Sequence, residues 1–564
     1  MSSFSPGLVL ILGAIAVPLL RGVTRQVYML ALPLLALLMA AFLLESGVHG
    51  RLALLGVELE LVRVDRLSTI FGIIFAIAAA IGVLYSQHEQ DPVQQTAGLI
   101  YAGAAIGAVY AGDLLTLFIF WEITAVSSVF LIWASGTERA YKAGMRYLII
   151  QVGSGVLLMA GAILHYADVG SLTFEKLGLN SFSNMLIFLA FGIKCAFPLL
   201  HNWLEDAYPE ATVGGTVMLS AFTTKLAVYA LARGFPGTEL LVYIGVVMTA
   251  FPIFYAVIEN DLRRVLAYSL NNQLGFMVAG IGVGTPLAIN GTAAHAFCHI
   301  IYKALLFMSM GAVLHRTGTI RGSELGGLYK SMPWTTGFCI VGAASISAFP
   351  LFSGFVSKSM IITAVAEQGY FVSWLLLLFA SAGVFHHSGI KIPFFAFFAH
   401  DSGIRVQEAP KNMLIAMAIA SVLCVGIGIF PQPLYMLLPH PVDFHPYTVA
   451  HVITQLQLLL FSALAFTWLM WSGVYPPELR STNIDFDIVY RKLLPYLFEN
   501  FAKMLVHIGD ALSNFLGKIF SRMIEQIYRY YGPHSIMAKS VSAGIMVFWV
   551  LTMFGTYLVA SLIG

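Results

Sequence analysis

The stretch GIKCAFPLLHNW, residues 192–203, carries a lysine inside an apolar run and a proline four residues after it. The word AFPL returns in SISAFPLFSGFVSK, residues 345–358, which ends in a second lysine. Proline lacks a backbone donor and clashes with the preceding helical turn, so Pro198 and Pro350 each predict a break within an apolar helix. Carbonyl groups freed at such a break need new donors, and we therefore expect water to reach both lysines.

The composition is that of a polytopic membrane protein. Of the 564 residues, 59% are hydrophobic and 10% charged, whereas soluble proteins carry about 25% charged residues. Windows long enough to cross about 30 Å of hydrocarbon recur along almost the whole chain. We expect an all-α fold with sixteen spans, at 6–20, 27–45, 67–86, 94–112, 113–134, 143–167, 184–204, 210–233, 240–258, 265–283, 287–314, 334–362, 370–399, 411–430, 451–472 and 541–563.

Charge and motif patterns exclude several functions. The net charge is +2 and no basic aromatic patch or glycine-rich phosphate loop is present, so we expect no nucleic-acid partner. No flavin, iron–sulfur or nucleotide motif is found, so we expect no cofactor. The cysteines lie in apolar spans without CxxC spacing and are expected to be buried packing residues, namely Cys195, Cys298, Cys339 and Cys424.

The distribution of basic residues predicts the orientation. With the N-terminus outside, 20 of the 30 Lys and Arg residues fall on the cytoplasmic side and five fall outside. The last five are lysines within the spans, where an ionisable group costs several kcal/mol and usually marks an ion path or a buried pair. They are Lys194, Lys225, Lys303, Lys358 and Lys391.

An amphipathic segment separates the last two spans. From Pro495 to about Tyr530, apolar residues recur at helical spacing and polar residues fill the other face. At 1.5 Å per residue this helix would be about 50 Å long. It either rests on the lipid surface or straps neighbouring subunits on the cytoplasmic side, and its length favours the strap.

The AFPL words begin 152 residues apart, at Ala196 and Ala348, within the fourth helix of two successive five-helix sets. An odd number of helices per set predicts repeats that are inverted in the membrane, with broken helices 7 and 12 near its middle. The expected divisions are 1–93 for the first three spans, 94–233 and 240–399 for the repeats, 400–475 for spans fourteen and fifteen, 476–535 for the lateral helix and 536–564 for the last span.

Several intramembrane residues suit proton transfer. Glu122 lies near the middle of span five, and we hypothesise that it forms an ion pair with Lys194. In HAFCHIIYKALLF, His295, His299 and Lys303 share one helix face. This face predicts a proton relay; a buried histidine pair is the alternative, and a zinc site would need a third ligand where an ammonium stands.

Secondary candidates lie near the ends of two spans. Lys391 precedes Pro393 by two residues and would otherwise snorkel to the interface, and His201 follows the first break. The charges of ENDLRRVLAYS, residues 259–269, are expected to form a solvated helix cap.

Together these segments resemble the signature segments of the antiporter-like subunits shared by respiratory complex I, membrane-bound hydrogenases and Mrp-type sodium/proton antiporters. The resemblance covers roughly residues 65–400 and includes FWEI in span five, NDLRRVLAYSLNNQLGFM and LGGLYKSMP. It implies a path from Glu122 through Lys194 and Lys225, then along His295, His299 and Lys303 to Lys358.

The chain departs from many relatives after the first break, where it reads Leu204-Glu205-Asp206-Ala207-Tyr208 instead of WLP followed by Asp-Ala-His. Its lysine pattern looks closest to the D-type members of the Mrp antiporters, whereas the lateral helix looks like longer members.

We therefore expect a proton-translocating subunit, with or without sodium exchange, that performs no catalysis by itself. The implied partners are membrane subunits of one assembly, including an antiporter-like subunit contacted by the lateral helix, in a prokaryotic plasma membrane. The alternatives are a proton-channel subunit of an inorganic-carbon uptake complex, a non-transporting scaffold, and a metalloenzyme that uses His295 and His299.

Overall fold

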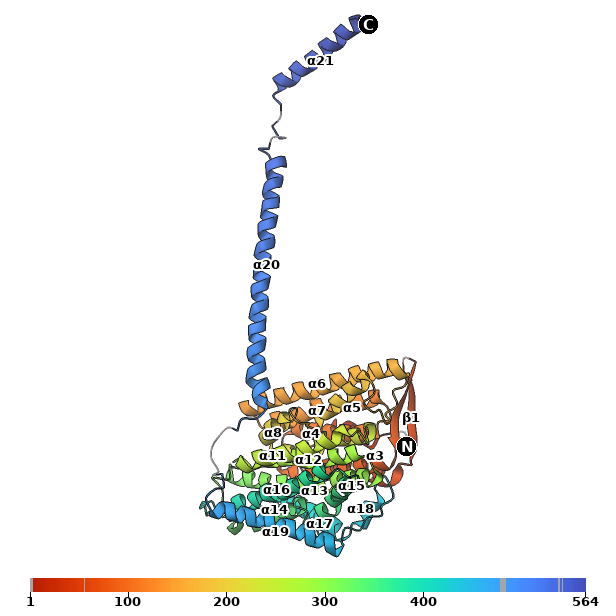
Figure 1. The fold of residues 1–564 in the computed structure, drawn as a ribbon, viewed down its shortest axis with the longest axis vertical. Coiled ribbons are helices and arrows are strands. Elements are labelled where there is room, and N and C mark those ends of the chain that lie inside the picture. The colour runs from red at the N-terminus through yellow and green to blue at the C-terminus, as the bar shows by residue number, and fades with distance from the viewer. Residues whose placement is uncertain (1–3, 55, 477–482, 536–537, 540, 564) are drawn as a thin grey trace. The chain divides into compact units, whose positions relative to one another are not determined.

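The computed structural model describes residues 4–54, 56–476, 483–535, 538–539 and 541–563. The chain divides into two units, Met1–Asn483 and Ile484–Gly564. In the first unit the long helices lie side by side in a bundle, with a β-hairpin at one end of it (Figure 1). This unit holds every residue that the sequence nominates for proton transfer.

The helices of the first unit follow the expected spans closely. Before the first break they are α1 (Pro6–Ala14), α2 (Gly22–Leu38), α3 (Arg66–Tyr85), α4 (Pro92–Tyr110), α5 (Leu114–Trp133), α6 (Glu138–Val169) and α7 (Phe182–Lys194). After it come α8 (Asn202–Ala207), α9 (Val213–Ala221), α10 (Thr223–Gly234), α11 (Leu240–Ile258), α12 (Leu262–Val283), α13 (Pro286–Thr317), α14 (Pro333–Ile346), α15 (Ser353–Glu367), α16 (Phe371–Val384), α17 (Lys411–Ile429), α18 (Gln432–Met436) and α19 (Val449–Trp471).

Within the described residues, 11 helical segments are long and apolar enough to cross a membrane by themselves. The other expected spans fall on helices that are shorter, broken or more polar. These are α1, α4, α7 with α8, α12, and α14 with α15. The polytopic helical fold is thus confirmed, and the total of sixteen spans stays a prediction.

One element was not expected from the sequence. Strands β1 (Gly47–Leu54) and β2 (Val57–Val64) form an antiparallel hairpin in which Gly47 pairs with Val64. The backbone amide of Glu60 donates to the Asp113 carboxylate over 3.0 Å, and Asp113 also caps α5. The hairpin therefore contacts the start of a membrane helix that carries Glu122.

The two AFPL words adopt one backbone conformation. Ala196 and Leu199 have φ of 62° and 71°, and Ala348 and Leu351 have φ of 58° and 72°. The amide of each AFPL phenylalanine donates to the carbonyl five residues earlier, over 3.0 Å at Phe197 and 3.1 Å at Phe349. This is a Schellman helix end in which alanine occupies the left-handed position that usually takes glycine. The repeated word therefore encodes a repeated break.

Helices on either side of Gly234 have matching lengths and spacing. Helices α4 and α11 both have 19 residues, and α6 and α13 both have 32. Each later helix begins 148 residues after its counterpart, as does α12 relative to α5. An isolated bridge joins Asp113 to Thr173 in the first set and Asp261 to Arg321 in the second.

The second unit contains a short π-helical turn at Val489–Leu493, then α20 (Leu494–Tyr531) and α21 (Ala543–Ile563). Helix α20 has 38 residues, which corresponds to about 57 Å. None of its residues is buried, and the same holds for α21. The amphipathic helix is therefore slightly longer than the expected Pro495–Tyr530, and its apolar face is exposed among the residues that the structure describes.

Candidate functional site

All five intramembrane lysines are buried. Lys194, Lys225, Lys303 and Lys391 have 0% exposed surface and Lys358 has 1%. An unpaired charge in such surroundings costs several kcal/mol, so each ammonium must find acceptors or give up its proton. Burial also removes the snorkelling alternative for Lys391.

Three of these lysines bind carbonyl groups that helix ends leave free. Lys225 Nζ donates to Ser220 O over 2.6 Å, at the junction of α9 and α10. Lys358 Nζ donates over 3.0 Å to Ile346 O, the last residue of α14. Lys391 donates to Val257 O and Glu259 O, at 2.6 and 2.7 Å, where α11 ends. Terminal carbonyls carry partial negative charge, so these ends stabilise a cation.

Lys194 is held by a neighbouring helix. Its Nζ donates to Trp121 O over 2.7 Å and to the Thr124 hydroxyl over 2.8 Å, both on α5. The ammonium also lies 4.2 Å from the centroid of the Trp121 ring, which adds a cation–π contact. Lys194 therefore connects the broken helix α7 to the helix that carries Glu122.

Among the described residues, no ion pair within 4.0 Å joins Glu122 to Lys194, although each charge acts on the other through space. The Glu122 Oε1 atom is buried without a hydrogen-bond partner in the described residues. It lies above Gly155 of α6, where an added Cβ would overlap with it. The hypothesis of a direct pair is thus wrong for this conformation, because the carboxylate turns towards α6.

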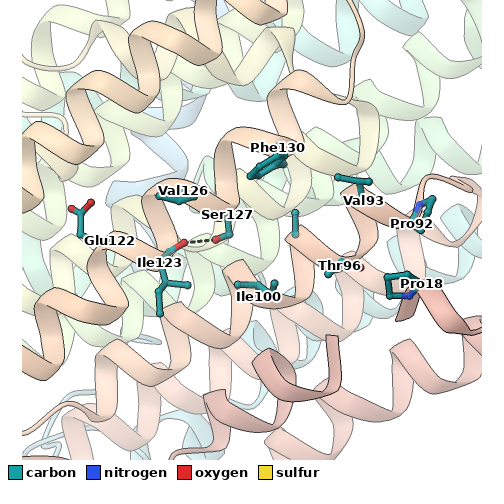
Figure 2. Close-up of a pocket in the computed structure, with 11 residues that line it drawn as sticks. Pro18, Pro92, Val93, Thr96, Ile100, Glu122, Ile123, Val126, Ser127 and Phe130 are labelled. Atoms are coloured by element: carbon teal, nitrogen blue, oxygen red, sulfur yellow. Dashed lines mark hydrogen bonds between the residues drawn. The ribbon is translucent and has the colours of Figure 1, made fainter. Parts of the chain in front are cut away.

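Glu122 also lines an apolar groove of about 590 Å³ between α4 and α5. It lies at one end of the lining residues, and Pro18 and Pro92 lie at the other (Figure 2). Inside the groove, the Ser127 hydroxyl donates to Ile123 O. Glu122 is therefore the group in this groove that can carry a charge.

The α13 face is brought together as the sequence predicts, and it gains partners from other helices. His295 Nδ1 lies 3.1 Å from Ser357 Oγ, and its Nε2 lies 3.1 Å from Gln273 Oε1. The Tyr302 hydroxyl donates to the same Gln273 oxygen over 3.2 Å. Both nitrogens of His295 are thus engaged by polar protein groups, which argues against a zinc ligand here.

The next two groups on this face have no hydrogen-bond partner among the described residues. Both ring nitrogens of His299 and the Nζ of Lys303 are buried without a hydrogen bond. The charges of Lys225 and Lys358 both act on Lys303 through space. Buried polar groups are normally satisfied, so these atoms require internal water.

Pattern reasoning missed several residues of this site. Gln273, Ser357 and Tyr302 are polar contacts that only packing brings to α13, and Phe276 lies 5.0 Å beneath the Lys358 ammonium. His387 is completely buried on a π-helical turn, Phe385–Lys391, close to Lys391. The sequence HHSGIK contains His387, and its position before a buried lysine was the available signal.

His201, the other secondary candidate, has 2% exposed surface and an edge-on ring contact with Phe251 at 4.6 Å. At the two breaks, Pro198 and Pro350 each lie two residues after an alanine with a left-handed backbone, Ala196 and Ala348. The four cysteines are free and buried, as predicted.

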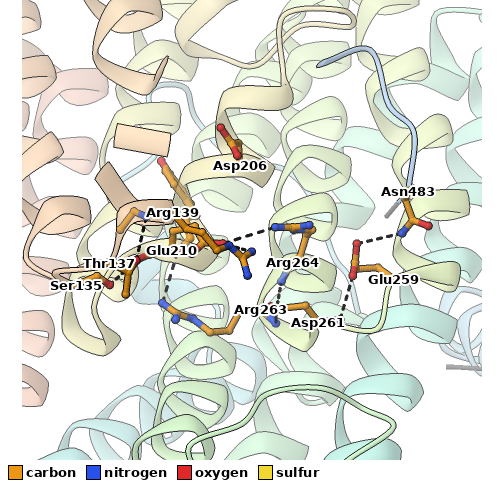
Figure 3. A network of polar contacts seen from close by, with 12 residues as sticks. Ser135, Thr137, Arg139, Asp206, Glu210, Glu259, Asp261, Arg263, Arg264 and Asn483 are labelled. Carbon is orange, nitrogen blue, oxygen red and sulfur yellow. Dashed lines mark hydrogen bonds and ion pairs between the residues drawn. The ribbon is translucent and has the colours of Figure 1, made fainter. Parts of the chain in front are cut away.

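A polar network joins the ends of several helices (Figure 3). Glu210 accepts from Arg139 over 2.5 Å and lies 3.9 Å from Arg264. Asp261 caps α12, as expected for ENDLRRVLAYS, but Arg263 has 3% exposed surface and donates to Ala211 O over 2.9 Å. The solvated cap is therefore only part of the arrangement, because Arg263 ties α12 to the start of α9.

The segment that holds the departures from the family pattern, Glu205 and Tyr208, makes a similar contact through Asp206, which the pattern retains. Asp206 in α8 accepts from Arg146 Nε over 2.7 Å, which fixes the short helix after the first break to α6. The altered loop is thus well packed, with Leu204 and Tyr208 both buried.

Comparisons with known proteins agree with this architecture. Residues 111–386 match the family described as NADH:quinone oxidoreductase/Mrp antiporter, TM. A D-type Na(+)/H(+) antiporter subunit from Alkalihalophilus pseudofirmus is 29% identical over 352 residues, covering 58% of this chain and 71% of that protein. Hydrogenase-4 component B of Escherichia coli is 26% identical over 415 residues, covering 65% of this chain and 62% of that protein.

Two solved structures share the fold. A chain of the Mrp complex from a Dietzia species has a TM-score of 0.67 at 20% identity, covering 79% of this chain and 99% of that one. A chain of the membrane-bound sulfane sulfur reductase, an archaeal respiratory membrane complex, has a TM-score of 0.71 at 23% identity and 99% coverage of both. Residues 111–386 therefore match the NADH:quinone oxidoreductase/Mrp antiporter family, and the chain shares its fold with a chain of each of these two complexes.

Proposed function

We propose that this chain is a proton-translocating subunit of a multi-subunit membrane assembly of the Mrp, hydrogenase or complex I type. Protons would move along Glu122, Lys194, Lys225, His295, His299, Lys303 and Lys358. The observation that carries the proposal is the buried row on α13, where Lys303 and His299 have no hydrogen-bond partner among the described residues and the charges of two further buried lysines, Lys225 and Lys358, act on Lys303. Such groups suit proton exchange through water better than structural bonding.

The roles of the residues follow from their contacts. Glu122 acts on Lys194 through space and sets how readily that ammonium keeps its proton. Lys194 and Lys225 pass protons through water to the imidazoles of α13, since an imidazole can accept at one nitrogen and release at the other. Lys303 and Lys358 then carry the proton to the far end of the row.

The test is Lys303→Met in the intact complex, reconstituted into liposomes with a pH-sensitive dye. Because Lys303 has no hydrogen bond to lose within the described residues, we expect normal assembly and thermal stability but a loss of proton transport of roughly 100-fold. Lys330→Met is the control, since this loop lysine is half exposed and binds Asp401. Unchanged transport in Lys303→Met would overturn the proposal.

A scaffold is the second candidate, because Lys225, Lys358 and Lys391 all bind helix ends and could serve as fixed braces. The scaffold function predicts that Lys225→Met and Lys358→Met lower stability, with transport unchanged in every variant that assembles.

Exchange of protons for sodium is tested separately, with a sodium gradient across the liposome membrane. Proton movement that is indifferent to a sodium gradient would restrict the proposal to protons.

We also propose that residues 94–233 and 240–399 are inverted repeats, as the matched helix lengths and breaks favour. The N-terminus would lie outside a prokaryotic plasma membrane, with α20 on the cytoplasmic side against another antiporter-like subunit. A photo-crosslinking residue at Phe501 or Phe515, on the exposed apolar face of α20, should capture that subunit. Cross-links to lipid alone would contradict this contact.

A further inference from the structure

A cavity of about 370 Å³ lies beside Lys358, between α15, α16 and α19. Seven of the 14 residues that line it carry polar side chains, although it lies against two mostly apolar helices of a membrane domain. Polar side chains in a spanning helix normally face water, a pore or a partner. The polar lining residues are Lys358, Ser359, Thr363, His451, Thr454, Gln455 and Gln457.

Helix α19 supplies a polar stripe that leads away from the second break. Gln455 Nε2 donates over 3.2 Å to Ser347 O, next to the carbonyl of Ile346 that binds Lys358. One turn earlier lies His451, in the first turn of α19. The stripe thus runs from the carbonyls around Lys358 to the beginning of the helix.

His451 is oriented for proton exchange. Its ring stacks on Phe355 with centroids 4.4 Å apart and planes 14° apart. Its Nδ1 lies 2.6 Å from Pro446 O, so Nδ1 carries the hydrogen and Nε2 carries the lone pair. Lys358 and His451 are the cavity's two titratable lining groups.

We propose that this cavity is the water-filled connection between Lys358 and the membrane face nearest the start of α19, with His451 as its outermost proton carrier. The ammonium of Lys358 gives a proton to cavity water, and the Nε2 of His451 takes one from the same water and releases it to the bulk. Lys358 is left neutral and is reloaded from the α13 row. This inference rests on the proposed function, in which Lys358 ends the row.

Thiol labelling tests the access of water directly. Thr454→Cys lines the cavity, whereas Ile453→Cys is 50% exposed on the apolar surface of the same turn, and the four native cysteines are buried. In the assembled complex, a membrane-impermeant methanethiosulfonate added on the face marked by His445→Cys should modify Thr454→Cys and block its transport. Ile453→Cys should stay unmodified. Labelling of Thr454→Cys by a membrane-permeant maleimide only would show a lipid-filled or covered cavity and overturn the inference.

The proton carrier is tested by chemical rescue. His451→Ala should slow proton transport, and imidazole added on the His445 face should restore part of it, which a purely structural defect would not allow. His445→Ala, in an exposed loop position, is the control. If Lys358→Ala abolishes transport while His451→Ala retains the full rate, the inference fails and the proposed function stands. If Lys358→Ala has no effect, the proposed function itself fails.

Discussion

Residues 192–203 and 345–358 fold into the same break, yet their lysines are held in different ways. Lys194 ends α7 just before the break and binds the neighbouring helix α5 through Trp121 O and Thr124. Lys358 lies beyond the break and reaches back to the last carbonyl of α14. Lys194 therefore binds a neighbouring helix, whereas Lys358 binds the helix end at its own break.

The helices that precede the breaks show a parallel difference. With the spacing of 148 residues between α6 and α13, Tyr147, Gln151 and Gly155 take the places of His295, His299 and Lys303. In the first half the missing side chain at Gly155 makes room for Glu122. One backbone plan thus holds a carboxylate in one half and a row of bases in the other.

The largest effect should come from arginine at either lysine. Arginine keeps a positive charge but cannot release its proton, so we expect Lys194→Arg and Lys358→Arg to lower proton transport by roughly 100-fold. The measurement is dye-monitored transport by the reconstituted complex. Full transport in Lys358→Arg with loss in Lys194→Arg would mean that only the first break carries protons.

Gly155→Ala should have the next largest effect. A Cβ there would overlap with Glu122 Oε1, so the carboxylate must leave its site above α6. We expect transport to fall roughly tenfold or more, as far as in Glu122→Gln. Gly153→Ala is the matched control, because a Cβ at this position meets no atom within 4 Å in the described part of the chain. Equal activity of both variants would show that the position of Glu122 does not matter.

The shared backbone conformation of the breaks predicts a smaller effect, on stability: here alanine-to-glycine substitution should not destabilise the protein. Ala196→Gly and Ala348→Gly relieve left-handed alanines and should leave stability unchanged or raise it by up to about 1 kcal/mol. Ala190→Gly and Ala343→Gly, within α7 and α14, should instead destabilise by about 1 kcal/mol. Thermal unfolding of the purified complex measures both. Destabilisation at one AFPL alanine only would show that the two breaks are not equivalent.

The smallest effect concerns the ion pairs outside the membrane. Arg405 and then Lys330 lower the pKa of the exposed Asp401, whereas Asp206 after the first break makes a more buried pair with Arg146. A lowered carboxyl pKa stabilises the fold above the unfolded value of about 4; this contribution shrinks as the pH falls below that value and is lost only when the pH falls through the lowered folded pKa. Asp401→Asn should thus lower the melting temperature slightly at pH 7 and by less at pH 3, and at pH 7 by less than Asp206→Asn does.

The sequence predicted the helices that carry the buried lysines, because apolar length, proline and intramembrane charge are local signals. Lys194, Lys225, Lys303 and Lys358 were all found in this way, and all are buried. The β-hairpin was missed, since two strands of eight residues give a weak pattern beside spans of about 20. The ion pair of Glu122 was predicted wrongly, since the sequence does not show which of several helices faces a side chain.

By itself, therefore, the sequence determined that this is a membrane protein with two like breaks and a row of buried bases, since each follows from the chemistry of a short segment. Tertiary structure alone decided which atoms receive those charges: the carbonyl of Ile346 for Lys358, the α5 helix for Lys194, and Gln273 and Ser357 for His295. These partners lie up to 73 residues away along the chain. Only the packing of helices brings them within the roughly 3 Å over which a hydrogen bond acts.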